Sequence, residues 1–301
     1  MKKTLVALAA VAATTAAMAD VTVFGIVDQA YASEKGTGGT TVKTIKGTYT
    51  GSELGFKGSE DLGSGLTGDF QIHFAPSIDN AAAPTGYQSW VGVKGGFGGV
   101  RIGQFFSPSF TNNATYDTVG YTAFGYNVGA VNTSAALTSN SIEYALPTLT
   151  PGLGVTFLTA QGENTTGSGA NNSTNYRISY DVGAFSVGYA AGNKKVNAST
   201  NKRDTSLGFS YDLGVAKLAY YGTSTKDTGG ATTTGSAYGV SVPFGATTLG
   251  VQASSSAGTT GSLVLVKHDL TKRTSAIFQT GRTKVSAGTT SGTSLGLWHS
   301  F

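Results

Sequence analysis

Hydrophobic and polar residues alternate with a period of two along most of this chain, and the period of an α-helix is nowhere sustained. The clearest stretch is 66–74, where Leu66, Phe70, Ile72 and Phe74 share one face and Thr67, Asp69, Gln71 and His73 share the other. The same alternation recurs at 53–57, 176–181, 185–189 and 215–221. The pattern predicts an all-β protein whose strands each have one apolar and one polar face.

The alternating runs are separated by two kinds of turn signal. Short ones such as 61–65, 181–183 and 212–214 alternate with long polar stretches, which we expect to be loops at 34–46, 161–173, 192–202, 223–234 and 281–292. Short turns that alternate with long loops are typical of an outer-membrane β-barrel. The pattern places strands at 21–33, 47–58, 65–74, 86–94, 98–104, 139–146, 153–161, 174–181, 184–192, 203–212, 215–223, 235–243, 246–254, 262–270, 272–280 and 293–301.

The pattern of strands predicts an antiparallel transmembrane barrel of sixteen strands, although fourteen or eighteen strands also fit the length. One connection is exceptional, because the alternation stops from Phe105 to about Asn132. A loop of this length in a compact fold is usually functional.

The amino terminus has the features of an export signal. Lys2 and Lys3 precede a short apolar run, and Ala17-Met18-Ala19 is a small-residue cleavage site. We therefore expect residues 1–19 to be removed and residues 20–301 to form the outer-membrane barrel. No later stretch approaches 18 consecutive apolar residues, so no membrane-spanning helix is predicted.

Composition narrows the function further. The 301 residues include no Cys, which excludes disulfides, thiolate metal sites and Cys nucleophiles. The net charge of +4 is spread without a basic run, so no nucleic-acid partner is expected. The spacing of the three His suggests no metal site, and we expect no cofactor. A G-x-S-x-G match at 292–296 lacks the following helix that a nucleophile elbow needs, so no catalytic residue is assigned.

Four motifs, in order, resemble the Gram-negative general porins of the beta-proteobacterial type. Val21-Thr22-Val23-Phe24-Gly25-Ile26-Val27-Asp28 is similar to that family's opening, and 51–63 is similar to its second strand and first periplasmic turn. Leu270-Thr271-Lys272-Arg273-Thr274 resembles a late turn, and His299-Ser300-Phe301 resembles the end of the family's last strand.

The resemblance implies a homotrimer of sixteen-stranded barrels in the Gram-negative outer membrane, with segment 105–132 folded into the lumen as a constriction. It also implies that Phe301 ends a strand read by the outer-membrane assembly machinery. The family often has Arg where Glu53, Gln104 and Trp298 stand here, and its inward loop carries more acid than the single Asp117. We therefore predict an electric field across the channel that is weaker than is usual in the family.

The residues expected to set conductance and selectivity are the charged side chains on the polar strand faces and in the inward loop: Asp117, Glu53, Lys57, Arg101, Arg177 and Lys217. Lys57, Arg101 and Arg177 are the favoured contributors, and Asp117 would supply the opposing negative pole.

The leading prediction is a water-filled channel for passive diffusion of ions and small hydrophilic solutes. The alternative is a substrate-selective channel with an aromatic-lined constriction built from Phe105, Phe106, Phe110, Tyr116, Tyr121 and Phe124. An outer-membrane enzyme is less favoured because no nucleophile–base set is apparent. A soluble adhesin is the remaining class.

Overall fold

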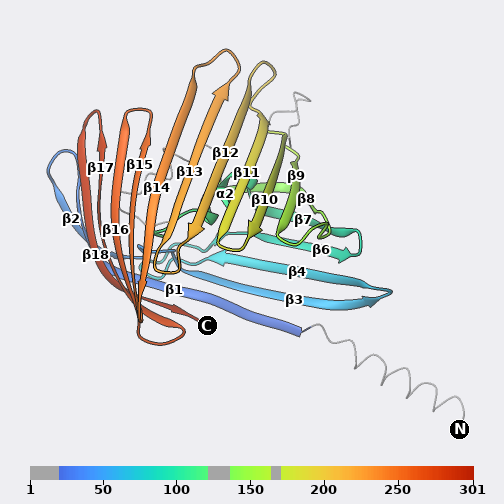
Figure 1. Ribbon diagram of the computed structural model, residues 1–301, viewed down its shortest axis with the longest axis horizontal. Coiled ribbons are helices and arrows are strands. Elements are labelled where there is room, and N and C mark those ends of the chain that lie inside the picture. Colours follow the sequence, from blue (N-terminus) through green and yellow to red (C-terminus); the bar gives the residue numbers. More distant parts are fainter. Residues whose placement is uncertain (1–19, 121–135, 164–170) are drawn as a thin grey trace, which may run out of the picture.

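The chain folds into one closed antiparallel β-barrel. The computed structural model describes residues 20–120, 136–163 and 171–301, so the predicted signal at 1–19 lies outside the described residues. Figure 1 shows the strands following one another around the barrel. The wall closes where β1 (Asp20–Lys35) pairs with the last strand, β18 (Gly288–Ser300).

Sixteen barrel strands are built from eighteen segments, because two of the strands are interrupted. β2 (Thr41–Lys46) and β3 (Glu53–Gly63) both pair with β1 and form one strand. β5 (Thr85–Gly86) and β6 (Ser89–Gly95) likewise both pair with β4 (Leu66–Ala75). The predicted count of sixteen is therefore confirmed.

The remaining strands follow in sequence order, each paired with the next. They are β7 (Gly98–Phe106), β8 (Leu137–Ala145), β9 (Leu153–Ala160), β10 (Ser173–Val182), β11 (Phe185–Lys195), β12 (Asn201–Asp212), β13 (Lys217–Asp227), β14 (Thr232–Phe244), β15 (Thr247–Ser256), β16 (Thr259–Asp269) and β17 (Thr274–Val285). One short helix, α2 (Pro108–Thr115), follows β7. Within the described residues, no helix is long and apolar enough to cross a membrane.

The break between β2 and β3 has a clear local cause. The carboxylate of Asp28 is buried in the wall, and its Oδ2 accepts hydrogen bonds from the backbone amides of Tyr49, Thr50 and Gly51 at 2.8–2.9 Å. These amides are turned toward the carboxylate. Asp28 thus replaces ladder bonds that the interrupted strand gives up, as a buried backbone donor requires a partner.

Several loops predicted from polar composition are shorter than expected. The predicted loops 223–234 and 281–292 are mostly strand, since β13 and β14 are joined by 228–231 and β17 and β18 by 286–287. Likewise β1 and β2 reach into 34–46, and β11 and β12 into 192–202. The physical reason is that a strand can continue above the membrane with both faces in water, so it needs no apolar face there.

We call the end of the barrel with the connections 107–136 and 161–172 the loop end, and the opposite end the turn end. Most connections at the turn end are tight. The link between β3 and β4, for example, is a two-residue turn at 64–65 in which Gly65 has φ +77°. Glycine tolerates this left-handed conformation without strain.

The two faces of the wall differ as the alternation predicts. On β12, Ser206 and Ser210 are buried on the face toward the barrel axis, whereas Leu207 and Phe209 are 46% and 43% exposed on the other face. Cross-strand register carries this sorting around the barrel, because paired residues share a face. The outer face is therefore apolar and the inner face polar.

Arginine placed on the two faces should have opposite effects on assembly. Ile72→Arg puts a charge on the apolar outer face, where it costs about 2–4 kcal/mol near the bilayer midplane, whereas the neighbouring Gln71→Arg faces the polar interior. We expect the Ile72 variant to fold poorly into lipid vesicles and the Gln71 variant to fold well. Heat-modifiable gel mobility measures the folded fraction, and equal folding of the two variants would contradict the facing assignment.

Candidate functional site

The inner wall carries most of the charged side chains of the barrel. In the described strands, the inward carboxylates are Asp28, Glu34, Glu53, Asp61, Asp69, Glu143, Asp181, Asp204, Asp212, Asp227 and Asp269. The inward basic side chains are Lys46, Lys57, Lys94, Arg101, Arg177, Lys194, Lys202, Lys217 and Lys267. A wall with this many charges of both signs is suited to contact with water.

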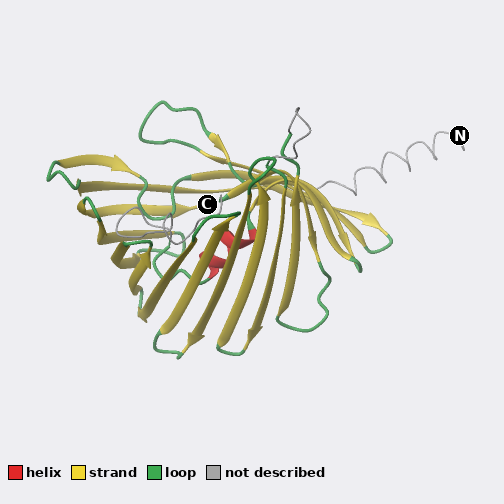
Figure 2. Ribbon diagram, turned by 90° about the horizontal axis from the view of Figure 1, so that it is seen from above, coloured by secondary structure: helices red, strands yellow, loops and turns green. Residues whose placement is uncertain are grey.

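The segment that follows β7 packs against this inner wall. Ser107 is the N-cap of α2 and accepts a hydrogen bond from the Phe110 amide at 3.2 Å, with Pro108 in the first turn. The helix contacts β9, β10, β11 and β12, on the concave side of the sheet (Figure 2). Sequence reasoning predicted the loop but not this helix, which is too short for a helical period to stand out.

Hydrogen bonds fix the helix to the wall. The Asn112 Nδ2 donates to the Ser206 Oγ at 2.9 Å and to the Gly188 carbonyl at 3.2 Å. Ser109 donates to the carboxylate of Asp204, and Ser206 donates to Asn113. These polar groups are buried, so each bond removes a group from water and gives it a protein partner.

Inward glycines let the segment approach the wall closely. A Cβ on Gly208 would lie 2.0 Å from the Tyr116 Cδ2, and a Cβ on Gly239 would lie 1.9 Å from the Thr118 Oγ1. The next residue, Val119, is fully buried against Leu263, Leu265 and Ile277 of the wall. We call Gly188, Gly208, Gly239 and Gly250, which each sit under a residue of the segment 112–119, the glycine row.

Burial raises the pKa of the Tyr116 phenol, which therefore stays neutral at physiological pH. Its hydroxyl lies 3.2 Å from the Ser186 Oγ of β11. The ring packs with Ala219, Tyr221 and Ala237, so Tyr116 anchors the segment after the helix.

Gly208→Ala should loosen this anchor. The added methyl group would overlap the Tyr116 ring, and overpacking of this kind destabilises by about 1–3 kcal/mol. We expect the free energy of unfolding in vesicles to fall by that amount, and Tyr116→Ala in the same chain to remove most of the additional loss. Gly96→Ala is the matched control, because a Cβ there meets no atom within 4 Å. Equal effects of Gly208→Ala and Gly96→Ala would refute the close approach.

The predicted basic residues each have a different environment. Arg101 lies in an ionic cluster: its Nη2 is 3.1 Å from the Asp69 Oδ2, its Nη1 is 3.7 Å from the Glu143 Oε1, and its guanidinium lies 3.9 Å from the centre of the Trp90 ring. Lys94 lies 3.9 Å from the same Asp69 oxygen. Sequence reasoning missed Glu143 and Trp90, since nothing in their local pattern marks them as partners of Arg101.

Arg177 binds the segment rather than facing open water. Its Nε donates to the Asn112 Oδ1 at 3.3 Å and its Nη2 donates to the Thr115 Oγ1 at 3.3 Å. Lys57 is exposed on the wall, with its Nζ 5.3 Å from the centre of the Phe24 ring. Lys217 is also exposed but lies at the turn end, paired in register with Asp212.

The two predicted acidic residues, Asp117 and Glu53, likewise do not lie together as one negatively charged patch. The Asp117 Oδ1 accepts hydrogen bonds from the amides of Val119 at 2.8 Å and Gly120 at 3.2 Å, which shapes the turn after the helix. The Glu53 Oε2 lies 3.3 Å from the His73 Nε2 on the inner wall. The six predicted residues therefore lie on four different strands and the loop segment and do not form a single cluster.

Phe301 follows the last strand at the point where the barrel closes. Its amide donates to the Gly25 carbonyl at 3.1 Å, and its carbonyl accepts from the Gly25 amide at 3.3 Å. Its side chain is 43% exposed.

A closed barrel with an apolar outer face and a charged interior defines an integral protein of the outer membrane. The sequence profile of the Gram-negative porins matches residues 4–288, and the chain belongs to that family. This match confirms the family that the sequence motifs suggested. It also confirms the predicted location in the outer membrane.

The chain is similar to known members of the family. It is 44% identical over 117 residues to the major outer membrane protein P.IB of Neisseria gonorrhoeae, and 41% identical over 114 residues to that of Neisseria meningitidis serogroup B. These matches cover 36% of this chain and about a third of each relative, 33% and 34%.

Solved structures share the fold over nearly the whole chain. The anion-selective porin from Comamonas acidovorans superposes with a TM-score of 0.83 at 24% identity, covering 94% of this chain and 100% of that one. The OmpF of Salmonella typhi, solved in complex with daunomycin, gives a TM-score of 0.74 at 15% identity over 94% of this chain and 100% of its own.

Proposed function

We propose that this protein is a water-filled channel for passive diffusion of ions and small hydrophilic solutes, with no enzymatic activity. The observation that carries the proposal is the charged inner wall of a closed sixteen-stranded barrel. Barrels of eight strands fill their interior with side chains, whereas barrels of this size leave an aqueous lumen. Membership of the porin family supports the same conclusion.

We further propose that segment 105–132 narrows the lumen. The supporting contacts come from its described part, which reaches from α2 across the inner faces of β10 to β16. Residues 121–132 lie outside the described residues. The same contacts give Arg177 a positioning role, because it holds Asn112 and Thr115 of the helix.

The selectivity that we propose is weak. Acidic and basic groups on the inner wall are nearly equal in number, and several lie in opposite-charge contacts, including Lys46 with Glu34 and Lys267 with Asp269. Glu53 and Lys57 remain candidates for contact with passing ions, together with Asp117 on the segment. Neighbouring opposite charges cancel much of each other's field at a distance.

Planar-bilayer recording tests the proposal directly. We expect stable single-channel steps and a small reversal potential in a salt gradient. An inserted, heat-modifiable protein that gave no conductance would refute the channel.

A substrate-selective channel is a second candidate, favoured by one observation. Five rings contact one another in succession from the wall to α2, with centroids 4.7–5.2 Å apart: Phe24, His73, Tyr87, Phe106 and Phe110. Such a row could guide a solute with an apolar face. Liposome swelling with sugars, organic acids and amino acids separates the two candidates, since a general channel ranks solutes of the same charge by size alone.

Three further proposals rest on the family. We propose a homotrimer, as an outer membrane protein of similar fold from Vibrio cholerae has been solved in a trimer form. Light scattering in mild detergent measures the assembly. We also propose that residues 1–19 are removed on export, and that the strand ending at Phe301 is read by the assembly machinery.

A further inference from the structure

A pocket lies in the wall at the break between β2 and β3. It is bordered on one side by the segment 47–52, which fills this break, and on the other by the connection 76–84 between β4 and β5. Its volume is about 310 Å³, which lies within the range of small-molecule sites in proteins. We call it the break pocket. None of its residues belongs to the segment proposed to narrow the lumen.

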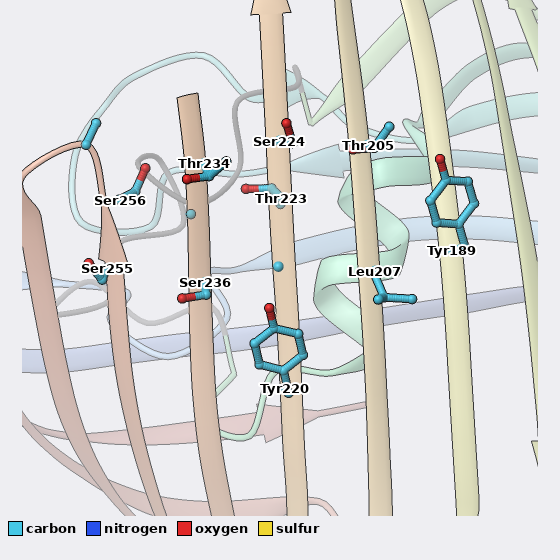
Figure 3. Close-up of a pocket in the computed structure, with 13 residues that line it drawn as sticks. Tyr189, Thr205, Leu207, Tyr220, Thr223, Ser224, Thr234, Ser236, Ser255 and Ser256 are labelled. Atoms are coloured by element: carbon cyan, nitrogen blue, oxygen red, sulfur yellow. The ribbon is translucent and has the colours of Figure 1, made fainter. Parts of the chain in front are cut away.

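The break pocket differs in charge from a larger groove on the outer face. That groove has a volume of about 520 Å³ and is lined by hydroxyl-bearing residues such as Thr205, Ser224 and Ser236, with no charged residue in its lining (Figure 3). The break pocket is lined by two carboxylates, those of Glu53 and Asp79. It is therefore the one of the two that favours a charged ligand.

The sign of that charge is negative. Of the described residues that line the break pocket, Lys46 is the only basic one, and its Nζ forms an ion pair with Glu34, which lies outside the lining. The charge of Lys46 is thus already balanced, and the carboxylates of Glu53 and Asp79 remain in excess. An uncompensated carboxylate in a partly enclosed site attracts a cation.

Two acceptors of the break pocket are suited to a donor from a ligand. The Gln29 Oε1 is buried and has no hydrogen-bond partner among the described residues. The Glu53 Oε2 lies 3.3 Å from the His73 Nε2, but that nitrogen makes no hydrogen bond within the described chain either. Buried polar atoms are nearly always hydrogen-bonded in folded proteins, so a ligand that donates hydrogen bonds fits this lining.

The break pocket also has apolar and aromatic walls. Pro76 and Ile78 line it, together with Tyr87. The rings of His73 and Phe106 contact the Tyr87 ring nearly at right angles, with centroids 4.7 and 4.9 Å away, and hold it in place. The face of an aromatic ring attracts a cation, most strongly where water is excluded.

This lining fits an organic cation better than a metal ion. In the part of the chain that the structure describes, no group of three or more His, Cys, Asp or Glu side chains is placed to hold a metal ion. Calcium takes about six to eight oxygen ligands, whereas an ammonium group has at most three N–H donors to satisfy. Apolar walls contribute nothing to a metal ion but stabilise an apolar body by burial.

We propose that the break pocket binds a small organic cation, in which an ammonium group is joined to an apolar body. The ammonium group donates a charge-assisted hydrogen bond to Glu53, and the Gln29 Oε1 accepts a further hydrogen bond from the ligand. The apolar body lies against Tyr87 and Ile78. The exposed Asp79 adds attraction from the solvent side.

Fluorine NMR of the mature protein in mild detergent, titrated with para-fluorophenethylamine, tests the proposal. Glu53→Gln should bind the amine at least about tenfold more weakly than the unmodified protein, since a hydrogen bond to a charged group is lost. The matched control is Glu60→Gln, the same change at an exposed position of the same strand, which should bind normally. Heat-modifiable mobility confirms that both variants are folded.

A second variant keeps the test independent of Glu53. Asp79→Lys reverses a charge in an exposed connection, where it does not disturb the barrel, and should weaken binding of the amine about threefold or more. The neutral alcohol with the same skeleton as the amine should bind far more weakly to the unmodified protein, because it lacks the charge.

Four outcomes would overturn the proposal: no binding of the amine by the unmodified protein, equal affinity of the Glu53→Gln and Glu60→Gln variants, unchanged affinity in Asp79→Lys, or equal affinity for the amine and the alcohol. Millimolar calcium separates the organic cation from a metal ion. If calcium abolished binding of the amine, the site would be one for a metal ion, and the organic cation would be rejected. Conductance is not measured in these experiments, so this proposal and the proposed channel can fail independently.

Discussion

Deletion of residues 112–124 should raise the single-channel conductance severalfold. The deletion removes the anchor residues Asn112, Tyr116 and Val119, and with them the segment that crosses the inner wall. An aqueous path widens when the chain inside it is removed, and its size limit for solutes rises with it. Planar-bilayer recording measures the conductance, and liposome swelling with sugars of increasing size measures the limit.

The control for this deletion is removal of 80–83, four exposed residues in the connection between β4 and β6. This shortens a loop without touching α2 or the glycine row, and conductance should stay near that of the unmodified protein. If the 112–124 deletion inserted normally and conducted no better than the control, the segment would not limit flow.

Replacement of Arg101 by glutamine should make the channel more cation-selective. Arg101 is the shared partner of Asp69 and Glu143, and its loss leaves two carboxylates on the inner wall with Lys94 as the nearest remaining cation. The reversal potential in a salt gradient should shift toward that of cations. Stability should also fall by about 1–3 kcal/mol, because charged groups at partly buried positions lose a hydrogen-bonding partner.

Lys217→Gln is the comparison that isolates the position of the charge. It removes the same formal charge from an exposed site at the turn end, away from the ionic cluster around Arg101. We expect a smaller shift in reversal potential and no loss of stability. Equal shifts in the two variants would mean that total charge, rather than the Arg101 cluster, sets the selectivity.

The strands could be predicted because each obeys a local rule. Phe70 and Ile72 alternate with Asp69 and Gln71 in the sequence itself, and the barrel places them on opposite faces of β4. The loops at 223–234 and 281–292 could not be predicted in the same way. Their Thr and Ser residues suit both a loop and a strand with water on both sides, and cross-strand pairing decides between them.

The candidate site was only partly predictable for a different reason. Placing Arg101 and Arg177 on the inner face needs only the period of two, and both placements agree with the register. Their partners come from distant parts of the chain: Asp69 is 32 residues from Arg101, and Asn112 is 65 residues from Arg177. No local pattern contains that information, so the roles of the two arginines differ although their sequence signals are alike.

The glycine row has a consequence for the order of folding. Its members lie on β11, β12, β14 and β15, and the bonds from the segment to this wall span 76 residues for Asn112 with Gly188 and 134 residues for Thr118 with Gln252. Contacts this distant in sequence form late, since long stretches of chain must first be ordered. The surface against which the segment packs does not exist until those strands are paired. We therefore expect residues 112–119 to dock after β11, β12, β14 and β15 have paired, rather than before.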